Sequence, residues 1–351
     1  MIGELKRTGY GSIKSTVLSS RQQTCLNKQI HQIEGSGINL ACRSLVSRRG
    51  CRWYNNTESF MSNNANASPA VMDIEDLVGL GEKRTVCPYF VSREMAHTSD
   101  LIFLPYNYLI DPKTRSGLDI AWNNAVLIFD EAHNIESVCS SSASFDLPVS
   151  IISGSIEEVG IAVELLSSRA GDGQKVGQSK GDNVMETVTN LRNLQLVLRK
   201  FEDVIASYQV PQQGITKPGE YILELFSDLM LNETTYSVFS CVMESAINVL
   251  TDDAMESGRH MSYKMNTTRL STLKDCLGKI LEAGSVHSFS GYRVHIHKER
   301  DKVTGTMLPT LSFWCFDPGE GMAALRTGNM NIRSILLTSG TLSPLSSFAN
   351  E

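Results

Sequence analysis

Long apolar runs that end abruptly in polar residues constrain the fold of this chain more than any other feature. Residues 101–110 read LIFLPYNYLI, and residues 125–136 read AVLIFDEAHNIE. Continuous apolar runs bounded by turn residues are typical of parallel strands buried on both faces. A third run, SILLTSGTLSP at 334–344, has the same form. We therefore predict an α/β fold built on a parallel sheet.

Two acids, Asp130 and Glu131, follow directly on the second run. They are expected at the carboxyl edge of the sheet, where α/β proteins bind ligands. One carboxylate there can hold Mg²⁺, and the next can orient a water molecule for attack on a γ-phosphate. The alternative is an acidic turn without chemistry. Such a site also needs a phosphate loop, but G-x-x-x-x-G-K-[S/T] does not occur in the sequence.

Size and composition point to an intracellular protein of two or three domains. The chain has 351 residues, and no apolar run approaches the length of a membrane span. The first residues lack the apolar core of a signal peptide. We therefore expect no membrane association, and thiols that stay reduced.

The net charge of −6 is unevenly distributed. Residues 1–53 hold nine Lys/Arg and two Asp/Glu, a balance of +7 that leaves −13 for the remainder. A basic segment on an acidic chain is a candidate phosphate-contacting surface, and a solvated basic face is the alternative. The candidate DNA-binding residues are Arg21, Arg43, Arg48, Arg49 and Arg52.

Four cysteines near the N-terminus, Cys25, Cys42, Cys51 and Cys87, are separated by 16, 8 and 35 residues. No C-x-x-C occurs, which argues against a zinc ribbon or knuckle. Spacing alone leaves a [4Fe–4S] cluster, a zinc site and unliganded thiols open. We expect the remaining cysteines to pack in the core; these are Cys139, Cys241, Cys276 and Cys315.

Residues 151–290 have helical periodicity, with apolar stripes from Val184 to Ile205 and from Leu270 to Leu281. The letters SIEE at 155–158 fit a capping box. Two strands are predicted at 292–297 and 311–316. His295 and His297 share one strand face, where solvent-facing histidines are commoner than a metal pair.

Several segments together resemble the iron–sulfur superfamily 2 DEAH-box DNA helicases, the group that includes the xeroderma pigmentosum group D helicase. They are SSRQQTC, CRWYNN, DIEDLVGLGEKRTVCPYF, LIFLPYNYLID, IFDEAHNIE, SASFDL and LTSGTLSP. Within the group, ITKPGEYILELF, YRVHIH and LSFWCFDPG are most similar to the branch that regulates telomere elongation. The resemblance covers essentially the whole chain.

The resemblance implies roles for matching positions. Cys25, Cys42, Cys51 and Cys87 would ligate a [4Fe–4S] cluster. Asp130 would hold Mg²⁺ and Glu131 would activate water. The residues that would couple hydrolysis to DNA movement are His133, Ser339, Gly340 and Thr341. The implied fold is a partial RecA-like parallel sheet that lacks its phosphate-loop strand, with an inserted iron–sulfur domain and an inserted helical arch domain.

The resemblance also implies a division of the chain. Residues 1–95 would form the cluster domain, 96–150 the first motor domain with its DEAH segment, 151–302 the arch, and 303–351 the return to the motor. Relatives carry a phosphate loop before such a segment and a second motor domain after it. We therefore expect an internal piece of a longer helicase, with strands 126–129 and 335–338 short of a neighbour and the first motor domain only marginally stable.

The implied function is that of an ATP-dependent 5′-to-3′ DNA helicase in telomere maintenance, DNA repair and recombination control. The implied partners are single-stranded, branched or looped DNA in the nucleus, with ATP and Mg²⁺ as cofactors of the longer protein. One alternative is a non-catalytic module that binds single-stranded DNA or a partner through its cluster and arch domains. The other is a zinc-stabilised scaffold unrelated to DNA.

Overall fold

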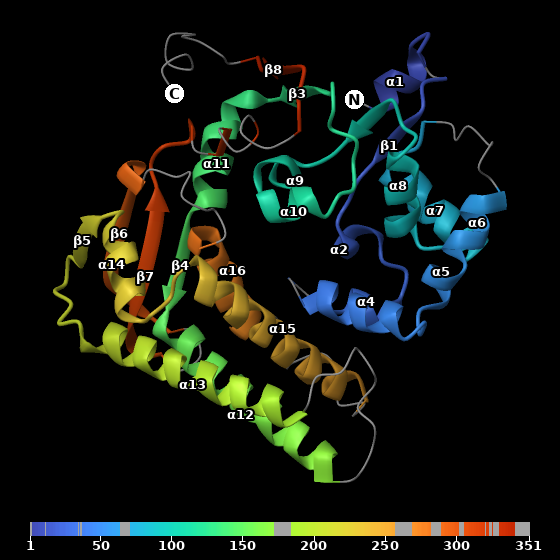
Figure 1. The fold of residues 1–351 in the computed structure, drawn as a ribbon. Helices are drawn as coiled ribbons and strands as arrows, with labels where there is room; N and C mark the ends of the chain where they lie inside the picture. The colour runs from blue at the N-terminus through green and yellow to red at the C-terminus, as the bar shows by residue number, and fades with distance from the viewer. Residues whose placement is uncertain are drawn as a thin grey trace. The chain divides into compact units, whose positions relative to one another are not determined.

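The computed structural model divides the chain into two compact units (Figure 1). The first comprises Met1–Val138, His260–Asn266 and Gly321–Glu351, and the second comprises Cys139–Arg259 and Thr267–Glu320. The residues that the structure describes are 2–10, 12–33, 35, 37–63, 71–171, 184–256, 269–281, 289–301, 305–319, 321–322, 325 and 330–340. Within these residues, no helix is both long enough and apolar enough to cross a bilayer.

Short helices and short parallel strands make up the first unit. Its helices are α1 (Ile2–Arg7), α2 (Arg21–Thr24), α3 (Lys28–His31), α4 (Gly37–Ser47), α5 (Arg52–Asn55), α6 (Thr57–Asn63), α7 (Ile74–Arg84), α8 (Pro88–Ala96), α9 (Tyr106–Ile110) and α10 (Pro112–Ser116). Its strands are β1 (Ser15–Val17), β2 (Leu101–Phe103), β3 (Val126–Asp130) and β8 (Ser334–Thr338). A 3₁₀ turn, η1 (Ala132–Asn134), and then α11 (Ile135–Ala143) follow β3.

Both strand pairs of the first unit are parallel, which confirms the predicted parallel α/β class. β1 pairs with β2 from Ser15↔Leu101 onward, and β3 pairs with β8 from Val126↔Ser334 to Asp130↔Thr338. The run at 101–110 is only partly a strand, because Pro105 has no N–H to donate to a ladder. The chain turns there, and α9 begins at Tyr106.

The prediction that the strands around 126–129 and 335–338 are buried on both faces is wrong. β3 alternates, with Leu127 and Phe129 buried on one face. Val126, Ile128 and Leu336 are 47%, 60% and 48% exposed on the other. In the described part of the chain, β3 and β8 pair only with each other. A two-stranded sheet covered on one side leaves its second apolar face in solvent.

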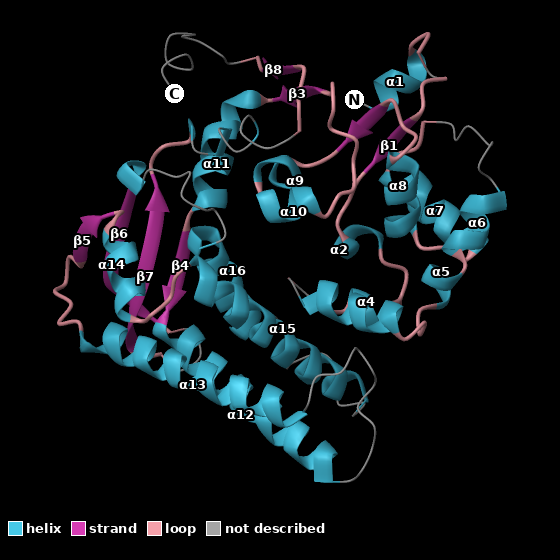
Figure 2. Cartoon of the chain, in the orientation of Figure 1, coloured by secondary structure: helices cyan, strands magenta, loops and turns pink. Residues whose placement is uncertain are grey.

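The second unit packs long helices against one antiparallel sheet (Figure 2). The strand order is β4 (Phe145–Pro148), β7 (Met307–Cys315), β6 (Tyr292–Arg300) and β5 (Ile215–Pro218). The predicted strands at 292–297 and 311–316 are therefore confirmed, whereas β5 interrupts the predicted helical region. The other elements are α12 (Val149–Gly171), α13 (Val184–Ser207), α14 (Tyr221–Asp228), α15 (Glu233–Glu256), α16 (Arg269–Leu281) and η3 (Phe289–Gly291).

The two faces of this sheet differ in chemistry. The inner face packs on the helices, and its side chains are buried; they include Phe145, Leu147, Tyr292, Val294, Ile296, Leu311 and Phe313. The predicted helical stripes from Val184 to Ile205 and from Leu270 to Leu281 are buried as well, except that Val184 is only half-buried. The outer face carries the alternate side chains; they include Asp146, Pro148, Arg293, His295, His297, Glu299, Leu308, Thr310, Ser312 and Trp314.

The predicted capping box at 155–158 is wrong, because these residues lie inside α12. Glu158 instead caps a different helix. Its two carboxylate oxygens accept hydrogen bonds from the backbone N–H groups of Arg269 and Leu270, each at 2.9 Å, where α16 begins. Burial raises the pKa of Glu158, and these two hydrogen bonds oppose the rise.

Glu158→Ala is therefore expected to lower the free energy of unfolding of the second unit by about 1–2 kcal/mol, since two amides at the start of α16 lose their acceptor. Urea unfolding would measure the change. Glu157→Ala is the matched control, because the Glu157 side chain is 74% exposed and makes only a 3.8 Å ion pair with Arg269. Equal losses in the two variants would contradict the capping role.

Candidate functional site

The ends of β3 and β8 bring five polar side chains together. Thr338 Oγ1 donates to Asp130 Oδ1 at 3.2 Å, and Ser339 Oγ donates to Glu131 Oε2 at 3.3 Å. His133 Nδ1 lies 2.8 Å from Ser339 Oγ and 3.3 Å from Glu131 Oε2. The contacts between the two strand ends join positions more than 200 residues apart in sequence. The acids thus lie at the carboxyl edge of the parallel pair, where the sequence placed them.

A tight reversal positions Glu131. Its backbone is left-handed, with φ of 54°, and η1 follows it directly. A non-glycine residue in this region is uncommon and is held there by its surroundings. Ala132, which is completely buried, anchors the turn. The reversal turns the Glu131 carboxylate toward Ser339 while its side chain stays 63% exposed.

Tyr106 is a residue of this site that the sequence did not reveal. Burial raises the pKa of its hydroxyl, with further contributions from the charges of Asp130 and Glu131. Its ring lies 5.6 Å from that of Phe129, between centroids. The local sequence gives no signal for this position, because Pro105 caps α9 and a helix rather than a strand follows it.

Gly340 and Thr341, in the third apolar run, are the remaining predicted coupling residues. Gly340 lies just beyond β8, and apart from its chain neighbours no atom of the described residues lies within 4 Å of the position its Cβ would take. Thr341 lies outside the described residues.

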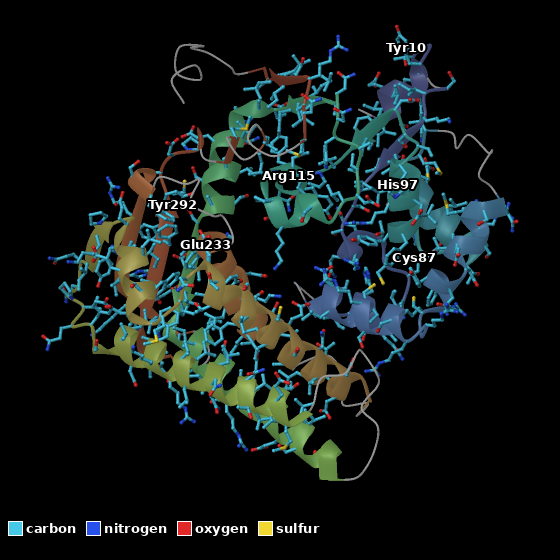
Figure 3. The ribbon with its side chains drawn as sticks, viewed as in Figure 1. Tyr10, Cys87, His97, Arg115, Glu233 and Tyr292 are labelled. Carbon is cyan, nitrogen blue, oxygen red and sulfur yellow. The ribbon has the colours of Figure 1, made fainter. Side chains whose placement is uncertain are left out.

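All four N-terminal cysteines line one small pocket, together with apolar residues such as Ile30 and Phe90. They come from four different places: Cys25 at the end of α2, Cys42 in α4, Cys51 before α5 and Cys87 before α8. Figure 3 labels Cys87 at the beginning of its helix. The structure thus gathers the four thiols that the sequence singled out.

Close packing of the helices makes this convergence possible. A Cβ on Gly81 of α7 would lie 2.5 Å from Pro88 Cγ and 2.9 Å from Leu26 Cδ1, so only glycine lets α7 approach the start of α8 this closely. The backbone N–H of Cys87 donates to Trp53 O at 3.1 Å, which ties α8 to α5.

Burial raises the pKa values of two of the cysteines in this pocket. Burial raises the pKa of Cys25 to about 11 and that of Cys87 to about 12, and the neighbouring cysteines add to both shifts. The thiols of Cys25 and Cys87 are therefore protonated at neutral pH unless a metal displaces their protons. The pocket that they line has a volume of about 20 Å³, and among the described residues no three His, Cys, Asp or Glu side chains form a group that could hold a metal ion.

Two candidate arginines directly follow pocket cysteines in sequence, Arg43 after Cys42 and Arg52 after Cys51. Arg43, Arg48, Arg49 and Arg52 are exposed. Arg21 donates to Asn39 Oδ1 at 2.8 Å, and its guanidinium lies 4.0 Å from the centre of the Tyr89 ring. Arg52 covers the Trp53 ring at 4.2 Å. Two of the candidate arginines, Arg21 and Arg52, thus pack their guanidinium groups on aromatic rings.

The remaining sequence predictions have mixed outcomes. Cys139, Cys276 and Cys315 are buried as expected, but Cys241 is exposed on α15. His295 and His297 do share a strand face. Their rings stack at 5.1 Å and 23°, a parallel arrangement in which the ring nitrogens do not converge on one point.

Two family models match consecutive parts of the chain. The model described as DEAD_2 matches residues 1–152, and the model described as the ARCH domain of RTEL1 helicase matches residues 154–318. Among solved structures, a chain described as truncated XPD aligns with 99% of this chain and 78% of its own length, at 14% identity and a TM-score of 0.46.

Full-length relatives are similar along the entire chain. The regulator of telomere elongation helicase 1 homolog of Oryza sativa subsp. japonica is 38% identical over 361 residues, which cover 100% of this chain and 35% of that protein. The Homo sapiens regulator of telomere elongation helicase 1 is 35% identical over 382 residues, covering 100% of this chain and 30% of that protein. The chain thus spans about a third of the length of these relatives, and along that span it is similar to the regulator of telomere elongation helicases.

Proposed function

We propose that this chain is the nucleotide-sensing and DNA-guiding segment of an ATP-dependent 5′-to-3′ DNA helicase that acts in telomere maintenance, DNA repair and recombination control in the nucleus. The observation that carries the proposal is the hydrogen-bonded contact of Glu131 and His133 with Ser339. It links the acidic turn after β3 to the end of β8, and the chain's relatives are telomere helicases by name.

The site chemistry supports this assignment. Asp130 and Glu131 are oxygen ligands at an exposed sheet edge, the donor type that Mg²⁺ prefers. A magnesium–nucleotide complex would supply the phosphoryl group whose loss drives the motor. Asp130 would hold the ion and Glu131 would orient the water molecule. A shift of Glu131 would change its contacts with Ser339 and His133. Because Ser339 directly precedes Gly340 and Thr341 in sequence, the shift would also affect these two residues.

The cysteine pocket fits an iron–sulfur cluster in its donor chemistry. Four thiols and an apolar lining are the usual environment of a [4Fe–4S] centre. Cys25, Cys42, Cys51 and Cys87 would each supply one thiolate. When bound, such a cluster would cross-link α2, α4, α5 and α8 and offset the charge of the arginines around it.

We further propose that residues 1–95 form a cluster domain, 96–150 and 303–351 parts of a RecA-like motor domain, and 151–302 the arch. Residues 307–315, which lie in the segment 303–351, form β7 in the sheet of the second unit. The exposed arginines beside the cysteine pocket would contact the phosphates of single-stranded DNA, because strand capture depends on phosphate neutralisation.

Glu131→Gln tests the nucleotide site. The sequence contains no phosphate-loop motif, so ATP turnover must be measured in a protein that joins this segment to one. DNA-stimulated hydrolysis is expected to fall by roughly 100-fold or more, because the amide cannot accept a proton from the attacking water. Glu136→Gln, in the exposed first turn of α11, should leave turnover unchanged. Wild-type turnover in Glu131→Gln would refute the assignment.

A further inference from the structure

Three aromatic rings lie together on the outer face of the second unit's sheet. They belong to His295 and His297 of β6 and to Trp314 of β7. Their centroids are 5.1, 5.0 and 6.2 Å apart in pairs, and no two of their planes differ by more than 40°. In a column of three stacked rings, the outer two would lie twice as far apart as neighbours do. These rings therefore overlap side by side across the sheet, and we call them the aromatic platform.

Small residues next to the rings leave room for the platform. Thr310 and Ser312 pair across the strands with the two histidines, and both are 0% exposed although they lie on the outer face. A Cβ on Gly214 would lie 2.5 Å from Cε1 of His295 and 2.7 Å from its Nε2. Any larger residue at 214 would therefore displace this ring. Short side chains thus let the rings lie close to the backbone of the sheet.

Two hydrogen bonds hold the rings in position. Trp314 Nε1 donates to Asp146 Oδ1 of β4 at 2.9 Å, and His295 Nδ1 lies 2.9 Å from Thr216 Oγ1 of β5. The platform therefore reaches across the four strands of this sheet. Both hydrogen bonds lie at exposed positions, and the three aromatic side chains are only half-buried. Since the indole N–H is already paired, the faces of the rings are the surface that a ligand can contact.

The charges around the platform favour a ligand that carries phosphate. Arg293 is exposed and pairs across the strands with Trp314. The carboxylate of Asp146 already accepts the indole N–H, and Glu299 lies toward the other end of β6. Burial lowers the pKa of His295, so this ring is neutral at pH 7. Uncharged rings beside a cation suit a nucleotide, because bases stack on aromatic rings and phosphates pair with guanidinium groups.

We propose that the aromatic platform is a stacking site for the bases of single-stranded nucleic acid. A base would lie on the rings, and the phosphate next to it would contact Arg293. Such stacking tolerates any sequence, because every base has a π-face. The platform belongs to the second unit, whereas the arginines proposed to contact phosphates beside the cysteine pocket belong to the first. It is therefore a second nucleic-acid site, which can be tested separately.

The first test locates the site in the unaltered chain. An oligothymidylate that carries 5-iodouracil is bound to the protein and irradiated, and the cross-linked residues are identified by mass spectrometry. Cross-links to Trp314, His295 or His297 are expected, since an iodouracil stacked on a ring reacts with that ring. Cross-links confined to the first unit would overturn the proposal. This measurement needs no variant, so it does not depend on how a substitution affects folding.

The second test measures affinity by the anisotropy of fluorescein-labelled oligothymidylate, in a whole chain that also carries Arg43→Ala and Arg52→Ala. In this background, Trp314→Ala should weaken binding by roughly tenfold, the loss expected for one stacked base. Trp314→Phe keeps an aromatic face and should bind nearly as well as the background. Phe316→Ala is the matched control, because this ring is 67% exposed and lies outside the platform; it should leave the affinity unchanged.

Three results would contradict the stacking site. If the two arginine substitutions weaken binding and Trp314→Ala adds nothing, the proposed role of the arginines stands and the platform is rejected. An abasic oligonucleotide of the same length that binds as tightly as oligothymidylate would show that bases are not recognised. An oligoproline peptide that binds the background chain when oligothymidylate does not would make the platform a peptide site.

Discussion

Cys51→Ser is expected to reduce the iron content of the purified protein to background and to loosen residues 20–90. Cys51 is buried in the cysteine pocket and precedes α5, so its loss would remove one of four proposed ligands and the cross-link between short helices that have little core of their own. Iron analysis measures the first effect. Amide hydrogen exchange across α2, α4 and α5 measures the second.

The control is Cys241→Ser. Cys241 is exposed on α15 in the other unit, and its replacement should change neither iron content nor exchange. Iron retained at the wild-type level in Cys51→Ser would reject this cysteine as a ligand. Zinc in place of iron in the wild-type protein would reject the cluster itself.

Phe313→Ala is expected to destabilise the second unit by about 3–5 kcal/mol, the usual cost of deleting a buried aromatic side chain. Phe313 is 1% exposed on the inner face of the sheet. Its ring stacks on Tyr292 at 4.7 Å and contacts the rings of Phe145 and Phe289 at 5.7 and 5.8 Å. Tyr292 is labelled at the start of β6 in Figure 3. Urea unfolding, followed by exchange of the β6 and β7 amides, measures the loss.

Phe316 provides a matched comparison three residues further on. It is 67% exposed, so Phe316→Ala removes the same ring without leaving a cavity. The free energy of unfolding should stay within about 0.5 kcal/mol of the wild type. Similar losses in both variants would mean that Phe313 does not hold the sheet to the helices.

The sequence predicted the strand ends well because their chemistry is local. An apolar run followed by Asp130 and Glu131 fixes which edge of a parallel strand carries the acids. The third run predicted a second strand end, and the structure pairs Asp130 with Thr338. Nothing local, however, indicated that Tyr106 lies beside them, because a helix rather than a strand follows Pro105.

Other predictions failed because they depended on what covers an element. Ile128 belongs to an apolar run, yet no periodicity reveals that its face is left in solvent. The letters around Glu158 fit a helix start as well as a helix interior, and α12, which begins at Val149, places them in the interior. Cys241 lies off the stripe that buries Tyr236, Met243 and Ile247 on α15, a signal that a helical projection could have found.

The exposed aliphatic side chains of the β3–β8 pair have a consequence for handling the protein. Val126, Ile128 and Leu336 present branched hydrocarbon to water beside an open strand edge, the combination that templates sheet-to-sheet association between molecules. This patch is therefore expected to lower the solubility of the protein. Kosmotropic salts such as sulfate strengthen apolar association, so they should lower the solubility of the protein. A helix that covered the patch should raise the solubility.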